Sequence, residues 1–193
     1  MKIFSLFFTL FICIGVCTPN TQQRPTDMGK LLTALNQPDT TDEAAKTILD
    51  LAAKDPSVRP SLAQKLPLMI QKSATDSVWV NAVRLSGELR LSEAVPALTK
   101  ALSHCSVSKG TVTLAEYMRL DTDLVGNALA QIGDPSIPSL TEILRTGSKS
   151  QRHRATLILL KMNSSLSEKT LKDHLFHEGD PDIRALIENR SPL

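Results

Sequence analysis

Residues 128–140 read Ala-Leu-Ala-Gln-Ile-Gly-Asp-Pro-Ser-Ile-Pro-Ser-Leu, and this stretch decides the fold. The apolar spacing up to Ile132 is typical of a helix. Gly133 can end that helix in a left-handed conformation, because glycine has no Cβ to clash. Asp134 and Pro135 then predict a new helix start, since aspartate caps helices and proline at the first position loses no hydrogen bond. The stretch therefore predicts two helices joined by a tight turn.

The same arrangement recurs along the chain. Each copy has an alanine-rich helical stripe, which we call helix A, and then a second helix, helix B, with two leucines four residues apart. The copies are spaced 31 to 42 residues apart, which indicates about four helix pairs. One pair cannot bury both of its faces, so the pairs must stack. The helix B segments begin Arg59-Pro60-Ser61-Leu62, Val95-Pro96-Ala97-Leu98 and Ile137-Pro138-Ser139-Leu140, with a degenerate copy at Lys169-Thr170-Leu171.

The second and third copies resemble a known repeat. Residues 82–98 read Ala-Val-Arg-Leu-Ser-Gly-Glu-Leu-Arg-Leu-Ser-Glu-Ala-Val-Pro-Ala-Leu. Together with residues 128–140, they are similar to the HEAT-like repeat named after phycobilisome lyases. Residues 82–98 depart from the family pattern at one point, because Arg90-Leu91-Ser92 stands where the family has a Gly-Asp-Pro turn.

The resemblance covers residues 76–146 well, residues 150–178 fairly and residues 27–73 weakly. It implies an all-α fold, an α-α superhelix in the form of a short HEAT-like solenoid of about four helix pairs. Repeats of this kind serve mainly as binding scaffolds, so the fold alone implies no activity. The best-known relatives are bilin lyases. An enzyme of that type, or another HEAT-repeat enzyme acting on a protein substrate, is therefore the alternative to a scaffold.

Residues 1–17 have the build of a secretory signal peptide. Lys2 precedes an apolar run of about 15 residues that ends at Cys17, and this is shorter than the ~20 residues of a membrane-spanning helix. We therefore expect an exported protein, in the periplasm, in the cell envelope or outside the cell. An uncleaved membrane anchor is the alternative interpretation.

The end of this signal permits two kinds of processing. Cleavage after Cys17 would leave small residues at the two positions that a signal peptidase reads, Gly15 and Cys17. Ile14-Gly15-Val16-Cys17 also resembles a bacterial lipobox, which implies a lipid on Cys17 and attachment to a membrane, although Val16 departs from that motif. Beyond the signal, Cys105 is the only cysteine, so we expect no internal disulfide and a buried, inert thiol.

The rest of the chain divides into a leader and one domain. Residues 18–26 are polar, contain two prolines and predict a flexible leader, and residues 27–190 form the predicted HEAT-like repeat domain. Pro67 interrupts the first helix B, so either that helix breaks near Leu66 or Pro67 sets its register. Residues 106–120 are an insertion, read as a loop followed by an extension of the next helix A, and either functional or merely tolerated.

Composition argues against a nucleic-acid partner. The formal net charge is only +2, and Trp79, Tyr117 and Phe176 are the only aromatic residues beyond residue 20. Proteins that bind single strands stack bases on rows of aromatic side chains, and such rows are missing from this sequence. Export from the cell also disfavours nucleic acid.

Two groups of residues could carry chemistry. His174, His177 and Glu178 share a helix face and are the best metal candidate, but a packing role for His174 is the alternative, and a single His-Glu pair supplies too few ligands. The stretch from Arg145 to Arg154 has four Arg or Lys residues and no acid, which indicates either an anion-binding patch or a loop and solvated helix start. We predict no metal, no cofactor and no catalytic residue.

The stacked repeats predict where a partner binds. In a handed stack of helix pairs, helix B lines the concave face, which is the expected binding surface. Its solvent-facing side chains differ in charge and kind, which favours a polypeptide over a uniform polyanion. We therefore predict an exported, non-catalytic scaffold that binds a protein partner. The predicted contact residues are Thr99, Lys100, Thr141, Glu142, Lys172 and Asp173.

Overall fold

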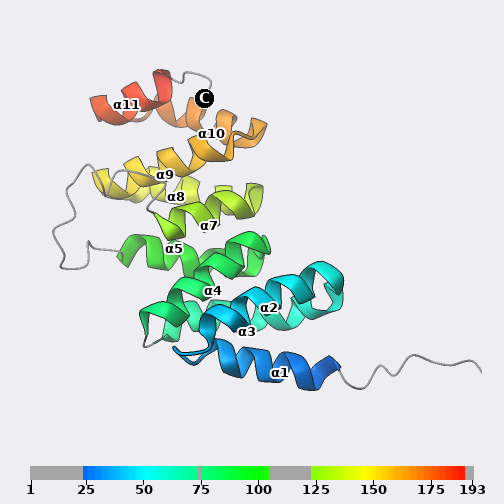
Figure 1. The fold of residues 1–193 in the computed structure, drawn as a ribbon. Coiled ribbons are helices and arrows are strands. Elements are labelled where there is room, and N and C mark those ends of the chain that lie inside the picture. The colour runs from blue at the N-terminus through cyan, green and yellow to red at the C-terminus, as the bar shows by residue number, and fades with distance from the viewer. Residues whose placement is uncertain (1–23, 74, 105–122, 190–193) are drawn as a thin grey trace, which may run out of the picture.

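The computed structural model describes residues 24–73, 75–104 and 123–189, and over these residues the protein is all-α (Figure 1). Ten α-helices and three short 3₁₀ helices are described, with no strand among them. None of the described helices is both long and apolar enough to cross a membrane. The α-helices are α1 (Arg24–Leu35), α2 (Thr41–Lys54), α3 (Arg59–Lys72), α4 (Asp76–Glu88), α5 (Val95–His104), α7 (Leu124–Ile132), α8 (Ile137–Thr146), α9 (Lys149–Met162), α10 (Ser165–Leu175) and α11 (Pro181–Glu188).

The segments predicted to form four helix pairs are all helical, as α2 and α3, α4 and α5, α7 and α8, and α9 and α10. The leucines that aligned the four helix B segments are all buried: Leu62, Leu98 and Leu140 have no exposed surface, and Leu171 is 1% exposed. Each lies on the face that its helix turns to its neighbours, where a leucine contributes about 2–3 kcal/mol by burial. The register deduced from the sequence is therefore confirmed at these positions.

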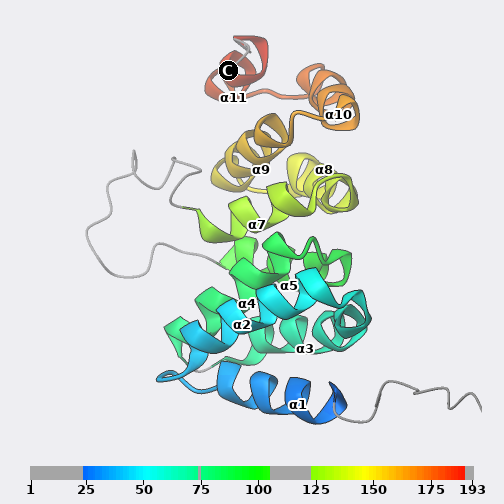
Figure 2. The same ribbon diagram turned by 45° about the vertical axis from the view of Figure 1, so that its right-hand side comes forward.

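Neighbouring helices pack in two rows (Figure 2). The A helices contact one another in the order α2, α4, α7, α9 and α11, and the B helices in the order α3, α5, α8 and α10. Helix α1 lies at the N-terminal end and packs on α2. Contacts between the rows, such as those of α3 with α4 and α8 with α9, close one continuous hydrophobic core.

Three of the turns contain a short 3₁₀ helix that the sequence did not predict. The 3₁₀ helices η1 (Pro56–Val58), η2 (Ser92–Ala94) and η4 (Asp134–Ser136) precede α3, α5 and α8. Asp55 caps η1 through the Ser57 N–H, as expected of an aspartate before proline. Asp134 does not cap: it lies inside η4, and its carboxylate accepts a hydrogen bond of 2.7 Å from the Ser164 hydroxyl. Gly133 has the positive φ of 82° that was expected, but its ψ of −142° lies outside the left-handed helical region.

Pro67 neither breaks α3 nor resets its register. The helix runs without interruption from Arg59 to Lys72, and Leu62 and Leu66 are both fully buried. Both interpretations of Pro67 were therefore wrong. Burial of these two leucines holds the helix together across the hydrogen bond that proline removes.

Close packing in the A row depends on one glycine. A Cβ added at Gly87 on α4 would lie 2.7 Å from the Cα of Ala128 on α7, closer than real Cβ contacts allow. The small residues Gly87 and Ala128 thus let α4 and α7 approach closely. Helix α4 then ends with Arg90 at a positive φ of 51°, and the Leu91 N–H bonds the Ser86 carbonyl at 3.0 Å.

Several sequence predictions fall outside the described residues or at their edge. Residues 1–17 with Cys17, the insertion at 106–120 and Cys105 all lie outside them. At the N-terminal boundary, α1 begins at Arg24, so residues 24–26 of the expected flexible leader are helical.

Candidate functional site

The predicted contact residues lie on three consecutive B helices. Helix α5 carries Thr99 and Lys100, α8 carries Thr141 and Glu142, and α10 carries Lys172 and Asp173. Thr99 is partly buried and the other five are exposed. Because α5 packs on α8 and α8 on α10, the six residues follow one row of helices.

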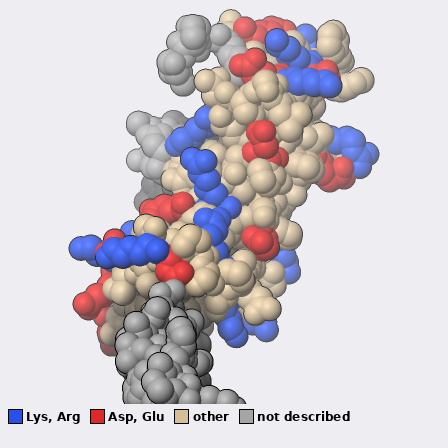
Figure 3. Space-filling model, turned by 90° about the vertical axis from the view of Figure 1, so that its right-hand side faces the viewer, with Lys and Arg blue, Asp and Glu red and all other residues tan. Residues whose placement is uncertain are grey.

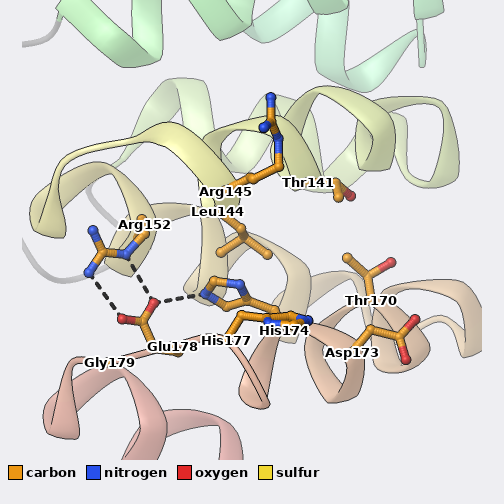
Figure 4. A pocket seen from close by; sticks show the side chains of 10 residues that line it. All are labelled: Thr141, Leu144, Arg145, Arg152, Thr170, Asp173, His174, His177, Glu178 and Gly179. Atoms are coloured by element: carbon orange, nitrogen blue, oxygen red, sulfur yellow. Dashed lines mark hydrogen bonds and ion pairs between the residues drawn. The ribbon is translucent and has the colours of Figure 1, made fainter.

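A cleft of about 720 Å³ lies between α8 and α10 (Figure 4). Of the predicted residues, Thr141 and Asp173 line it, and Glu142 reaches it indirectly by pairing with Arg145, at 2.7 Å. Thr99, Lys100 and Lys172 are not part of its lining. The lining residues are Thr141, Leu144, Arg145, Arg152, Thr170, Asp173, His174, His177, Glu178 and Gly179.

Glu178 is the polar centre of this cleft. Arg152 donates two hydrogen bonds of 3.0 Å to its two carboxylate oxygens, and the Asp180 N–H donates a third, of 2.9 Å. Nε2 of His174 lies 2.8 Å from Oε2 (Figure 4). The Glu178 side chain is only 1% exposed. One buried carboxylate thus joins α9, α10 and the start of α11.

These contacts fix the charge of Glu178. Burial alone would raise the pKa of the Glu178 carboxyl, but the hydrogen bonds from Arg152, the Asp180 N–H and His174 outweigh burial and lower its pKa from 4.5 to about 2. Glu178 is therefore ionised at neutral pH. A carboxylate held this far below neutrality is a poor general base.

The histidines do not converge on a metal site. His174 turns to Glu178, and Glu178 is already saturated by Arg152. Among the residues that the structure describes, no group of three His, Cys, Asp or Glu side chains could hold a metal ion. The packing interpretation of His174 fits its partly buried position in an ion-pair cluster.

The hydroxyl groups of the cleft are also engaged. Thr141 donates to the Ile137 carbonyl at 2.8 Å, and Thr170 donates to the Leu166 carbonyl at 2.9 Å. Neither is bonded to a histidine or carboxylate that could activate it as a nucleophile. The cleft can therefore recognise a ligand through the hydrogen-bonding groups that line it.

The basic stretch from Arg145 to Arg154 is neutralised by carboxylates. Arg145 pairs with Glu142 and Arg152 with Glu178, and Lys149 lies 2.8 Å from Asp180 and 2.7 Å from Asp182. The hydrogen bond to Asp180, then that to Asp182, raises the pKa of Lys149. This pairing argues against the anion-binding patch, because its cations already have acidic partners.

Arg154 forms the most buried of these pairs. Its side chain is 6% exposed, and it lies 2.7 Å from Asp123, which is 8% exposed. The same guanidinium donates a 3.0 Å hydrogen bond to the Leu102 carbonyl, and Asp123 in turn caps α7 through the Gly126 N–H. Arg154 on α9 therefore ties the last turns of α5 to the start of α7.

The sequence contained a signal for part of this cleft. Thr170, Asp173 and His174 are spaced i, i+3 and i+4 on one face of α10, and His177 continues this spacing in the turn that follows the helix. Because the two histidines were interpreted as metal ligands, this shared spacing was not recognised as one wall of a cleft. The pairing of Arg152 with Glu178 had no signal, because the two residues are 26 positions apart, one on α9 and the other between α10 and α11.

Searches of protein-family models, of curated proteins and of solved structures find no match to this chain.

Proposed function

We propose that this protein is an exported, non-catalytic scaffold with a HEAT-like solenoid that binds a protein partner along its B helices. The order of contacts supports a repeat architecture, since each A or B helix packs on the next of its own row. In such a stack the B row lines the concave side. Residues 1–17 supply the export signal, with a lipid on Cys17 as the means of attachment if the lipobox is used.

The observation that carries the proposal is the α8/α10 cleft. It opens on the row that also carries Lys100, Glu142 and Lys172, and its walls are held by the buried Glu178 network. Clefts with a few fixed polar groups are typical of recognition sites. A preorganised surface loses little conformational entropy when it binds.

The charge pattern favours a polypeptide. Figure 3 shows cations and carboxylates scattered over a largely uncharged face, without a broad area of one sign. Glu142 and Arg145 on α8 neutralise each other, and Lys172 stands beside Asp173 on α10. A surface of this kind complements mixed charges, which proteins present and polyanions do not.

Site-specific photo-cross-linking tests this proposal in the native cell. A photoreactive amino acid is placed singly at Lys100, Glu142 or Lys172, and at Arg84 or Gln131 on the A row as matched controls. We expect one polypeptide to be cross-linked from the B-row positions and not from the controls. Equal cross-linking from both rows would remove the B-row assignment, and cross-linking from the controls alone would invert it.

Mass spectrometry of the mature N-terminus tests export separately. A diacylglycerol on Cys17 would place the protein on a bacterial membrane, and a free Thr18 would make it a released exported protein. An intact Met1 in the mature protein would contradict cleavage after residue 17 and would favour the uncleaved membrane anchor.

A further inference from the structure

A second hollow of about 720 Å³ lies between α1 and α3, at the opposite end of the molecule from the α8/α10 cleft (Figure 1). We call it the α1/α3 groove. Helix α1 packs mainly on α2, whereas α3 packs on α4 and α5, so the two helices diverge and leave the groove between them. The groove is lined by Gly29, Leu32, Thr33, Asn36, Lys65, Leu68, Met69, Lys72, Ser73 and Thr75.

Each wall of the α1/α3 groove is one helical stripe. On α3, Lys65, Leu68, Met69 and Lys72 follow the spacing i, i+3, i+4 and i+7, and on α1 the residues from Gly29 to Asn36 repeat that spacing. A Cβ added at Gly29 would meet no atom within 4 Å, so this wall is open. The groove is therefore elongated along two helices, the shape that receives a third helix.

The floor of the α1/α3 groove is apolar. Leu68 is 46% exposed, and Leu32 and Met69 are partly buried. Leu68 is one of only four large hydrophobic side chains that are exposed within the described residues. Covering it with a leucine of another chain would remove apolar surface from water on both sides, which favours association.

The charge of the α1/α3 groove is uncompensated. Lys65 and Lys72 are exposed, no acid lines the groove, and neither lysine has an ion pair or hydrogen bond within the described part of the chain. This differs from the α8/α10 cleft, where Arg145 and Arg152 both have carboxylate partners. Unlike those arginines, the two lysines have no acidic partner among the described residues and are available for one.

We propose that the α1/α3 groove binds an acidic amphipathic helix of a partner protein. Lys65 and Lys72 are separated by two helical turns, about 10 Å, with Leu68 and Met69 between them. A helix with acidic residues at i and i+7 and leucines at i+3 and i+4 repeats this spacing with the opposite charge. Its carboxylates pair with the lysines, and its leucines cover Leu68 and Met69.

A synthetic peptide tests this proposal with the full mature chain. The probe is a fluorescein-labelled peptide of about 18 residues, long enough to form a helix, that repeats the Glu-x-x-Leu-Leu-x-x-Glu pattern. Fluorescence anisotropy measures its binding. We expect saturable binding that weakens several-fold between about 0.05 M and 0.3 M salt, because screening weakens exposed charge pairs.

Two variants separate the groove from general surface charge. Lys65→Glu with Lys72→Glu should weaken binding about tenfold, mainly through the association rate. Lys46→Glu with Lys54→Glu, which changes the charge equally at exposed positions of α2, should leave binding within about twofold. Leu68→Ser should also weaken binding. All these sites are exposed, so melting curves should stay close to that of the parent.

Four results would overturn the proposal. The first is that the peptide does not bind at millimolar concentration, and the second is that both lysine double variants lose peptide affinity equally. The third is that a peptide with lysine in place of glutamate binds as well as the probe. The fourth is that the protein binds phosphatidylglycerol vesicles and not the peptide. The last result would identify the groove as a lipid-binding surface instead.

Discussion

The α8/α10 cleft and the α1/α3 groove have the same volume, but the cations of the cleft are paired with carboxylates and those of the groove are not. In the cleft, Arg152 and His174 converge on one buried carboxylate. In the groove, Lys65 and Lys72 face solvent with no acid beside them. Charges that are already paired serve mainly to hold helices in place, whereas unpaired exposed charges are available for a partner. The comparison distinguishes charges that hold helices together from charges that are available to a partner. Amino-acid composition alone does not show this difference.

The largest expected effect tests whether paired, buried charges hold the helices together. Arg154→Ala would leave Asp123 buried without its ion-pair partner, and should lower the free energy of unfolding by about 3–5 kcal/mol. Chemical denaturation monitored by circular dichroism measures this loss. Lys65→Ala is the control and should change stability by less than about 0.5 kcal/mol. Similar losses in both variants would mean that pairing does not distinguish the two regions.

Lowering the pH should also reduce stability through the paired charges of the α8/α10 cleft. The pKa of Glu178 in the folded protein is about 2, below its ordinary value of 4.5, so its contribution is complete above pH 4.5 and is lost as the pH falls toward 2. The contribution reaches about 3 kcal/mol. Glu178→Gln should remove it at neutral pH. The difference in stability between parent and variant, measured by denaturation at several pH values, should then shrink below pH 4.5.

A difference that does not change with pH would contradict the assignment of this contribution to the ionised Glu178. Lys72→Gln is the matched control. Lys72 has no ion pair within the described residues, so its removal should leave the pH profile of stability unchanged.

Two glycines allow closely packed helices to be compared with the open wall of the α1/α3 groove. Gly87→Ala places a methyl group against the Ala128 backbone and should destabilise the protein by about 1–3 kcal/mol. Gly29→Ala in α1 has no atom within 4 Å of the new methyl group and should stabilise the helix by about 0.5–1 kcal/mol. Thermal melts of the two variants should therefore shift in opposite directions. Shifts of the same sign would show that α1 and α4 are equally crowded.

The smallest effect concerns one residue of strained backbone. Arg90 has a φ of 51°, which costs a non-glycine residue about 1 kcal/mol. Arg90→Gly should therefore leave stability unchanged or raise it by up to about 1 kcal/mol, as measured by the denaturation midpoint. A clear loss would mean that the Arg90 side chain makes a stabilising contact that outweighs the strain.

The sequence predicted the helix pairs and their leucine register because both depend on local spacing. Leu98 and Leu140 were aligned as equivalent helix B positions from their spacing, and both are fully buried. The turns were predicted less well. Asp134 was expected to cap a helix, but the Ser164 hydroxyl, which comes from the next pair, binds its carboxylate instead. A contact between pairs overrode a local preference, and local rules cannot anticipate that.

The candidate site was predicted only in part, for the same reason. Exposure of Thr141 and Asp173 follows from their helical positions, and both line the cleft. The ion pairs that shape the cleft join Arg152 to Glu178 and Arg154 to Asp123, and these partners are 26 and 31 positions apart. A single sequence does not reveal which cation meets which acid once the helices stack.

The contacts of Arg154 have a consequence for how neighbouring helices move together. One guanidinium bonds the Leu102 carbonyl and the Asp123 carboxylate, so the end of α5 and the start of α7 are both attached to α9. Local opening of α9 would release both attachments at once. These three helices should therefore exchange their amide hydrogens as one cooperative unit.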